Sequence, residues 1–343
     1  MESIKAISKE TSFLFDPYTR GMNQKTFNYL IETYTSSERQ RHRVCFHQNT
    51  KVDLHDIIIA YDKQTYIPPN KHVGKPETIM LLKGELEVYI FNDNGLCVNA
   101  IKLSAEDKEY PFLLRMPPNT WHGLRCISEG PCIVKETITG PYDSKSLQWA
   151  EFAPSEKING ETNQGFKYYE RLSSQNAQEL SKPKRSEYIQ INECILQSCD
   201  QFPTVNREVV VKLKEMAEKT ELQRARLCLH PNTNDSLQEM IIYLTGSCDI
   251  DVSYHINKDE SLAVIEGEGR HDFYSDDNKV YSSYRLANFK TMLKRGSDFR
   301  CFTRINRFVP HKIIPSGEGV AIYEATTGPF HREDTQYLLE QKL

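Results

Sequence analysis

Histidine and glutamate residues recur at one spacing in the two halves of the chain. Four residues separate a His from a Glu, six more separate the Glu from a Gly, and a second His follows later. The residues are His72, Glu77, Gly84 and His122 in the first half, and His255, Glu260, Gly267 and His311 in the second. Imidazole and carboxylate groups can move protons or bind divalent metals. A purely structural hydrogen-bonded cluster is the third reading, and the spacing alone leaves all three open.

These two sets belong to a longer internal repeat. The decapeptides RHRVCFHQNT at 41–50 and RARLCLHPNT at 224–233 share six residues at a shift of 183. The same shift relates the first His, the Glu and the Gly of the two sets, and it grows to 189 at the second His. Each copy closes with Thr-Gly-Pro and an aromatic residue. Because these matches keep one order, the chain is predicted to be a tandem duplication of units of about 150 residues.

The elements that must position these residues are mostly strands. Runs such as VDLHDIIIAYD, TIMLLKGELEVYIF and GVAIYEATTG are rich in β-branched and aromatic residues, and turn sequences at 92–95 and 275–278 separate other strands. Residues 23–37 and 206–221 carry apolar residues at helical spacing, and each begins with Asn, a favoured N-cap. Many short strands predict a sandwich or barrel in each unit.

Composition narrows the class of protein. The 343 residues include 43 basic and 47 acidic side chains, a net charge of −4, which argues against a nucleic-acid-binding protein held by bulk charge. No run approaches the roughly 18 apolar residues of a membrane span, and the polar N-terminus shows no secretory signal. The nine cysteines lack CxxC spacing, so we expect reduced thiols in a cytoplasmic protein. Motifs for nucleotide-driven phosphoryl transfer, Rossmann redox chemistry and serine hydrolysis are absent.

The His–Glu–Gly order with a later lone His resembles the two cupin motifs. In that family an HxH pair, a Glu and a lone His converge inside a double-stranded β-helix barrel and hold a divalent metal. The order of RxRxCxHxN, a proline-flanked His, the Gly-centred turns KGE and EGE and the Thr-Gly-Pro ending resembles, more narrowly, the WbuC-type cupin fold metalloproteins. The likeness covers about residues 37–155 and 220–335.

This resemblance implies a mainly β fold. Two double-stranded β-helix (cupin, or jelly-roll) barrels would follow one another, each preceded by a helix, and would pack as an intramolecular pseudo-dimer. The expected segments are an N-terminal helical or extended segment at 1–40, a first barrel at 41–154, a polar linker at 155–205, a helix at 206–223 and a second barrel at 224–343. A short helix within the linker is left open.

The resemblance also implies a divalent transition metal such as Fe, Mn, Zn or Ni. Its ligands would be His72, Glu77 and His122 with a weak Asn70 in the first unit, and His255, Glu260 and His311 in the second. The sequence departs from the family at the first His of the HxH pair, where Asn70 and Ser253 stand. Two His and one carboxylate still make a facial set with open positions. We expect weakened binding, possible loss in one unit, and the first unit as the active one.

Polar residues shared by both units are candidates for substrate binding and catalysis. The substrate-binding candidates are Arg41, Arg43, Asn49, Lys75, Arg224, Arg226, His230, Lys258 and Arg304, and the catalytic candidates are His47, Glu136 and Arg115. Arginine suits phosphate or carboxylate because its planar fork binds two oxygens; a solvated edge strand is the alternative. Glu136 and Glu324 lie in predicted strands, where each orients a ligand His or remains a surface charge.

Two classes of function stay open. A small-molecule enzyme would use the metal to polarise a carbonyl, as an isomerase, epimerase or dioxygenase on a sugar-derived, anionic molecule; the resemblance links it to surface-polysaccharide biosynthesis. A non-catalytic sugar- or metabolite-binding module, or a metal-free isomerase, would carry degenerate sites. An enzyme needs room for substrate beside the metal positions, whereas a degenerate binder fills that space with side chains.

Overall fold

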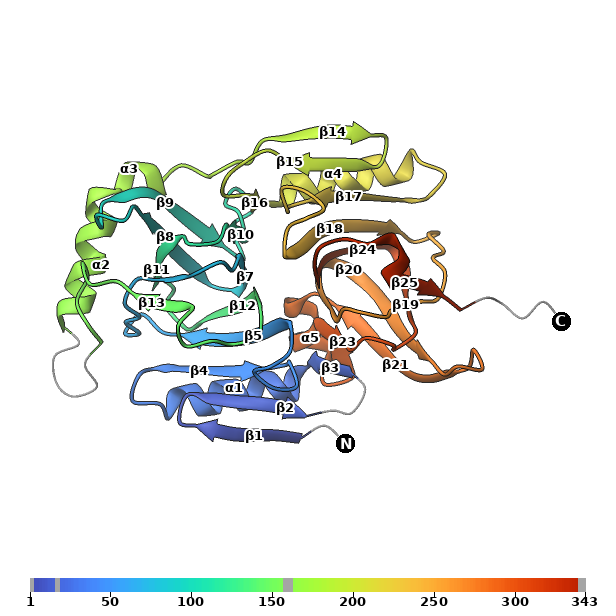
Figure 1. Ribbon diagram of the computed structural model, residues 1–343, viewed down its shortest axis with the longest axis horizontal. Helices are drawn as coiled ribbons and strands as arrows, with labels where there is room; N and C mark the ends of the chain where they lie inside the picture. Colours follow the sequence, from blue (N-terminus) through green and yellow to red (C-terminus); the bar gives the residue numbers. More distant parts are fainter. Residues whose placement is uncertain (1–2, 16–18, 157–162, 339–343) are drawn as a thin grey trace.

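A computed structural model describes residues 3–15, 19–156 and 163–338. Two β-rich units stand side by side (Figure 1), the first coloured blue to green and the second yellow to red. Residues 1–2, 16–18, 157–162 and 339–343 of the segments expected from the sequence lie outside the described residues. No helix in the described part of the chain is long and apolar enough to cross a membrane.

The two units repeat the same order of elements, apart from α5 and β22 of the second unit. The first unit contains β1 (Ser3–Ser8), β2 (Thr11–Phe15), β3 (Thr19–Met22), α1 (Gln24–Thr35), β4 (Arg41–Cys45), β5 (Leu54–Tyr61), β6 (Asn70–His72), β7 (Glu77–Lys83), β8 (Glu85–Phe91), β9 (Cys97–Ser104), β10 (Leu113–Met116), β11 (Trp121–Cys126), β12 (Cys132–Thr139) and β13 (Leu147–Trp149). The second contains β14 (Tyr188–Asn192), β15 (Ile195–Ser198), β16 (Thr204–Val205), α4 (Arg207–Glu218), β17 (Arg224–Cys228), β18 (Leu237–Thr245), β19 (Ser253–His255), β20 (Glu260–Tyr274), β21 (Val280–Ala287), α5 (Phe289–Arg295), β22 (Phe299–Arg300), β23 (Phe302–Ile305), β24 (His311–Thr327), a 3-10 turn (Arg332–Asp334) and β25 (Thr335–Tyr337). Thus β20 spans the counterparts of β7 and β8, and β24 spans those of β11 and β12.

Sheets curve around an apolar interior in each unit. The first unit has sheets of order β1-β2-β4-β5-β12-β7-β10-β16 and β13-β6-β11-β8-β9; the second has β14-β15-β17-β18-β24-β20-β21-β22, joined by β19, β23 and β25. Because alternate residues of a strand face one side, the inward set forms a separate core, around Ile79 and Val88 in the first barrel and Leu262 and Val320 in the second. The expected mainly β fold with two double-stranded barrels is confirmed.

Glycine sets the bend inside each barrel. Gly84 and Gly267, which the sequence places at equivalent turns, have φ of +88° and +80°. This left-handed region strains any residue with a Cβ. The bend lets the chain of β7 turn into β8, and lets the long strand β20 wrap round its barrel.

Helices α1 and α4 begin where the sequence predicts. The Asn23 side chain accepts a hydrogen bond from the Thr26 backbone N–H at 3.0 Å, and the Asn206 side chain accepts one from the Val209 N–H at 3.3 Å. Both N-cap predictions are therefore confirmed. Each helix buries its apolar face against the first strands of its own unit, so the helices support the strands that carry the repeated decapeptides.

Replacing Asn206 by alanine is expected to lower the free energy of unfolding by about 1 kcal/mol, because a first-turn N–H loses its acceptor. Urea unfolding followed by circular dichroism measures the change. Asn94→Ala in an exposed turn is the matched control and should stay within about 0.5 kcal/mol of the parent. Equal effects of the two substitutions would contradict a capping role.

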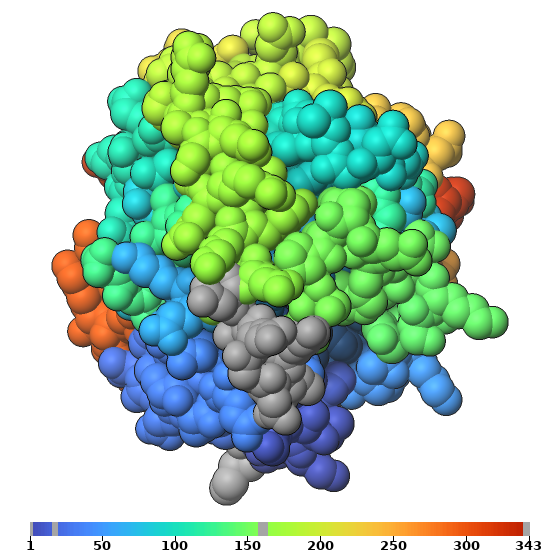
Figure 2. Space-filling model, turned by 90° about the vertical axis from the view of Figure 1, so that its left-hand side faces the viewer, coloured from blue at the N-terminus to red at the C-terminus, as the bar shows by residue number. Residues whose placement is uncertain are grey.

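The segment expected to be a polar linker, residues 155–205, is largely ordered instead. It forms α2 (Asn163–Gln175) and α3 (Ala177–Leu180), followed by the hairpin β14–β15 and the short β16. The two helices lie across the outer face of the first barrel (Figure 2), where Tyr168, Tyr169 and Leu172 join an aromatic cluster with Tyr89. The β14–β15 hairpin is the counterpart of β1–β2, so the repeat begins earlier in the second unit than the sequence indicates.

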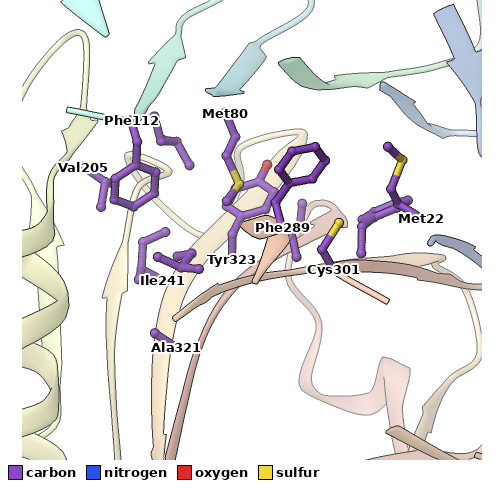
Figure 3. Packing of buried hydrophobic residues seen from close by; sticks show 14 of the residues in the cluster. Met22, Met80, Phe112, Val205, Ile241, Phe289, Cys301, Ala321 and Tyr323 are labelled. Carbon is purple, nitrogen blue, oxygen red and sulfur yellow. The ribbon is translucent and has the colours of Figure 1, made fainter. Parts of the chain in front are cut away.

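The two units exchange strands where they meet. β3 of the first unit pairs antiparallel with β23 of the second, and β16, which leads into α4, pairs antiparallel with β10 of the first. A shared apolar core lies between the barrels, and Met80, Phe112, Val205, Ile241 and Tyr323 are among its members (Figure 3). Since this core draws on both units, the barrels stabilise one another.

Candidate functional site

Each barrel brings the two predicted histidines and the glutamate together. In the first barrel, Glu77 Oε2 lies 3.5 Å from His72 Nε2 and 3.4 Å from His122 Nε2. In the second, the corresponding atoms of His255 and His311 each lie 3.2 Å from Glu260 Oε2. Residues about fifty positions apart in the chain therefore converge on a single carboxylate oxygen in both units.

Strand pairing and one backbone hydrogen bond hold the two histidines of each set. His122 on β11 lies opposite Asn70 on β6, two residues from His72, and residues opposite one another share a face. The Asn119 N–H, in the turn before β11, donates to the His72 carbonyl at 3.0 Å. In the second barrel Ser253 lies opposite His311, and the Phe308 N–H donates to the His255 carbonyl at 2.7 Å.

The contacts of Nδ1 favour one tautomer of the second histidine. His122 Nδ1 lies 3.1 Å from the Thr120 carbonyl oxygen, and His311 Nδ1 lies 3.0 Å from that of Val309. A carbonyl can only accept, so Nδ1 carries the proton and neutral Nε2 presents a lone pair to the glutamate. Oε2 of Glu77 and of Glu260 is buried without a hydrogen-bond partner among the described residues. Lone pairs that face one another in this way need a proton or a cation between them.

The two carboxylates differ in their electrostatics. Burial raises the pKa of Glu77 to about 8 and lowers the pKa of His72 to about 3, the latter helped by His122. In the second barrel burial also acts to raise the pKa of the glutamate and to lower that of the histidine, but the closer contacts between these groups outweigh burial. His311 and His255 hold the pKa of Glu260 well below its usual range, and Glu260 raises the pKa of His311. The two sites therefore differ in the balance between burial and neighbouring charge.

The donor set fits a divalent transition metal by its chemistry. As the side chains stand, no group of three or more His, Cys, Asp or Glu residues within the described ranges is placed so that it could hold a metal ion. Yet in each barrel two imidazole Nε2 atoms each lie 3.2–3.5 Å from one unpartnered carboxylate oxygen, and this donor set suits Fe, Mn, Zn or Ni. The unpartnered Oε2 in each barrel is the observation that supports a fit.

A second carboxylate and an arginine lie beside each set. Glu136 on β12 is diagonal to Glu77 across the β7–β12 pair, and Glu324 on β24 is diagonal to Glu260. Burial, then Glu77, raises the pKa of Glu136 to about 8; burial, then Glu260, raises the pKa of Glu324 to about 7. Both carboxyls can therefore hold a proton near neutral pH.

The arginine nearest the second carboxylate comes from the repeated decapeptide. Arg43 on β4 lies opposite Ile59, a member of the first barrel's interior cluster, so its side chain faces that interior. Its charge acts to lower the pKa of Glu136, as Arg226 does for Glu324. Arg43 is half-buried and Arg226 exposed. This pair of shared arginines therefore acts on the second carboxylate of each barrel.

Arg115 and Arg304 lie between the barrels instead. Arg115 reaches into the second unit, with Nε 2.7 Å from Glu239 and Nη2 2.7 Å from Asp235. Arg304 lies 3.3 Å from Asp56 of the first unit and 2.7 Å from Asp259 of its own. Both guanidinium groups are engaged in buried ion pairs, so this placement argues against their predicted roles in catalysis and substrate binding.

The remaining candidates occupy structural positions. Arg41 forms an ion pair with Glu156 at 3.1 Å, and Lys258 lies 4.0 Å from Asp334. The side chains of Asn49 and Asn232 accept hydrogen bonds within the turns that follow them, and Lys75 Nζ donates to the Pro141 carbonyl. Arg224 is exposed. His47 stacks on His55 with ring centroids 4.1 Å apart, and His230 Nδ1 accepts from the Glu239 N–H at 2.9 Å. Asn70 keeps the expected face but its amide donates to the Pro68 carbonyl at 3.3 Å. None of these contacts links a candidate to Glu77 or Glu260.

Repeat analysis missed one residue of the second barrel. His271 is fully buried on β20, and its ring lies 5.2 Å from that of His311. Its counterpart at the shift of 183 is Val88, so a search for shared residues passes over it. The signal available was strand alternation, which places residue 271 on the inward face together with Phe273.

Comparisons with known proteins agree with this architecture. Salicylate 1,2-dioxygenase from Pseudaminobacter salicylatoxidans superposes with a TM-score of 0.59 at 11% identity, covering 97% of this chain and 89% of that one. A mutant of that enzyme in complex with gentisate superposes with a TM-score of 0.60 at 12% identity, covering 94% and 86%. At such identities the likeness shows the fold alone. That fold is the bicupin fold, with two cupin barrels in one chain.

Sequence comparison adds one match. A family described as a domain of unknown function (DUF6016) matches residues 22–103 and again 205–286. The two matched stretches begin at equivalent points of the two units, which agrees with the tandem duplication. A search of curated protein sequences finds no match. The narrower resemblance to WbuC-type proteins stays a prediction.

Proposed function

We propose that this bicupin protein binds a divalent transition metal at the His–His–Glu set of each barrel and acts on a small anionic molecule beside it. The observation that carries the proposal is the buried, unpartnered Oε2 of Glu77 and of Glu260, each facing two imidazole Nε2 atoms within 3.5 Å. A repeated arrangement of three donors around one point is costly unless a cation or proton satisfies it.

The neighbouring residues suggest how an anionic molecule would be held. When bound, the metal would polarise a carbonyl or hydroxyl oxygen of the ligand. Arg43 or Arg226 would bind a carboxylate or phosphate through its planar fork. Glu136 or Glu324, with a pKa raised to about 8 or about 7, would hold a proton at its carboxyl oxygen and act as acid or base. The contact of Nδ1 with a backbone carbonyl would keep His122 and His311 as Nε2 donors.

A non-catalytic binding module is the second candidate, and the packing of the first barrel favours it. Ile57, Ile79 and Met116 are buried in an apolar cluster inside that barrel. A hollow of about 120 Å³, lined among others by Arg125, Tyr169 and Glu170, opens elsewhere, on the outer face near α2. Side chains thus fill much of the interior, as expected for a degenerate binder.

The finer predictions rest on the sequence alone. A sugar-derived ligand, a link to surface-polysaccharide biosynthesis, a cytoplasmic location and membership of the WbuC type remain part of this proposal as predictions. The reciprocal strand exchange between the units supports the predicted pseudo-dimer.

Metal content tests the proposal directly. Tag-free protein loaded with Mn²⁺, Fe²⁺, Zn²⁺ or Ni²⁺ and desalted is expected to hold about two equivalents of one of them by plasma mass spectrometry, since each barrel carries a complete set of donors. His72→Ala should remove about one equivalent, because it leaves only one imidazole and one carboxylate in the first barrel. Glu260→Gln should remove about one equivalent, because it takes away the carboxylate of the second barrel. His331→Ala, an exposed histidine, should remove none. No retained metal after loading with each ion would leave the metal-free binding module as the better account.

A further inference from the structure

We propose that His271 is a third nitrogen ligand in the second barrel, which makes that site an assembly of three imidazoles and one carboxylate. The inference rests on the proposed function, because it assumes a metal between His255, Glu260 and His311. It adds a ligand that the repeat does not contain. It also assigns the tighter metal site to the second barrel, whereas the sequence analysis expects the first unit to be the active one.

The strand register places His271 on the same side as the known set. Phe273 on β20 lies directly opposite His311 on β24, and His271 lies two residues before Phe273. Side chains two residues apart on a strand share a face, and diagonal neighbours of this kind are within reach of aromatic rings. The His271 and His311 rings meet edge to face at 72° with centroids 5.2 Å apart.

The hydrogen bonding of His271 leaves one nitrogen available. Its Nδ1 lies 3.1 Å from the Thr303 hydroxyl on β23, while its Nε2 is buried without a hydrogen-bond partner among the described residues. With Nδ1–H donating to Thr303, Nε2 has a free lone pair, as a metal ligand requires. An unsatisfied nitrogen in a fully buried side chain carries a cost, and coordination would remove it.

The first barrel has no such residue. The equivalent position is Val88, a buried member of the apolar interior cluster. Each barrel also lacks the first His of the cupin pair, with Asn70 or Ser253 in its place. His271 would restore the third imidazole in the second barrel from a different strand. The two sites should therefore differ in affinity although their shared residues are the same.

Cobalt(II) binding to a protein with only the second site tests this. In a His72→Ala background, His271→Val copies the residue of the first barrel, and His271→Gln keeps a polar side chain in case valine disturbs folding. We expect either variant to weaken Co²⁺ binding at least tenfold in competition with a chromophoric chelator. Loss of an outer-shell partner already weakens metal binding by roughly tenfold or more, and loss of a direct ligand should cost no less. The Co²⁺ d–d absorption band should also shift as one nitrogen ligand is lost. His47→Val, which removes a buried imidazole of the first unit, should change neither quantity.

The outcomes separate the inference from the proposed function. If both His271 variants bind Co²⁺ as tightly as their parent while Glu260→Gln loses it, His271 is not a ligand and the proposed function stands. If the parent binds no Co²⁺ and none of the other divalent metals, both fall. Circular dichroism melting curves confirm that each variant is folded.

Discussion

Replacing Arg304 by methionine should lower the free energy of unfolding by about 3–5 kcal/mol, because it breaks a buried ion network from one side. Arg304 is fully buried; it lies 2.7 Å from Asp259 and 3.3 Å from Asp56, and it donates to the Leu54 carbonyl at 3.0 Å. Burial alone would raise the pKa of Asp56, but Lys135 and then Arg304 outweigh it and lower that pKa. Methionine would leave the Leu54 carbonyl and part of the charge of both aspartates uncompensated in a dry interior.

A surface arginine provides the matched control for this experiment. Arg295 lies 2.7 Å from Glu268, but its side chain is 52% exposed. Exposed ion pairs are usually worth no more than about 1 kcal/mol, so Arg295→Met should change stability little. Urea unfolding followed by fluorescence compares the two variants with the parent, without the ionic screening that guanidinium adds. A similar, small loss in both variants would show that the network between the barrels is dispensable.

The site was largely predictable because it lies within the repeat. His72, Glu77 and His122 and their copies were found from spacing alone, and strand pairing then brings each set within 3.5 Å. Local signals also sufficed for the Asn-capped helices and the Gly-centred turns. In each of these features, the residue type and its immediate neighbours in the chain decide the structure.

Features that depend on contacts between the units were not predictable. Arg115 and Arg304 recur at equivalent positions, but a repeat preserves an interface as well as a pocket, so recurrence could not separate the two. The hairpin β14–β15 was included in the predicted linker because that prediction extended a polar stretch of weak apolar periodicity. Ile189 and Ile191 on β14 are exposed. His271 stands in one unit only, and no pairwise comparison of the units could find it.

Acidification should destabilise the protein through a stacked pair of histidines. His47 and His55 lie with their rings 4.1 Å apart and 7° from parallel, and both are buried. Burial, then the neighbouring imidazole, lowers the pKa of His47 to about 3; burial, then Lys75, lowers that of His55 to about 4. Both rings are therefore neutral in the folded protein at pH 7, so His47 would not serve as the proton carrier expected from the sequence.

The sign of the effect follows from the direction of these shifts. In the unfolded chain both histidines bind a proton near pH 6.5, so below that pH the unfolded state binds more protons than the folded state. Stability from the pair is complete above about pH 6.5 and is lost progressively as the pH falls toward the folded values. Since each pKa unit corresponds to about 1.4 kcal/mol, His47 alone should account for a loss of about 3 kcal/mol between pH 6.5 and pH 4.

Substitution of the pair isolates its share of the acid sensitivity. His47→Phe keeps a flat ring against His55 and Phe13 but has no proton to bind, so its urea midpoint should fall less between pH 6.5 and pH 4 than that of the parent. His331→Phe, at an exposed position outside the stacked pair, is the control and should follow the parent. The comparison uses the pH slope and not the stability at one pH, so a packing defect from the larger ring shifts the whole curve without changing its slope. Parallel curves for His47→Phe and the parent would mean that the stacked imidazoles take up protons as readily in the folded protein as in the unfolded chain.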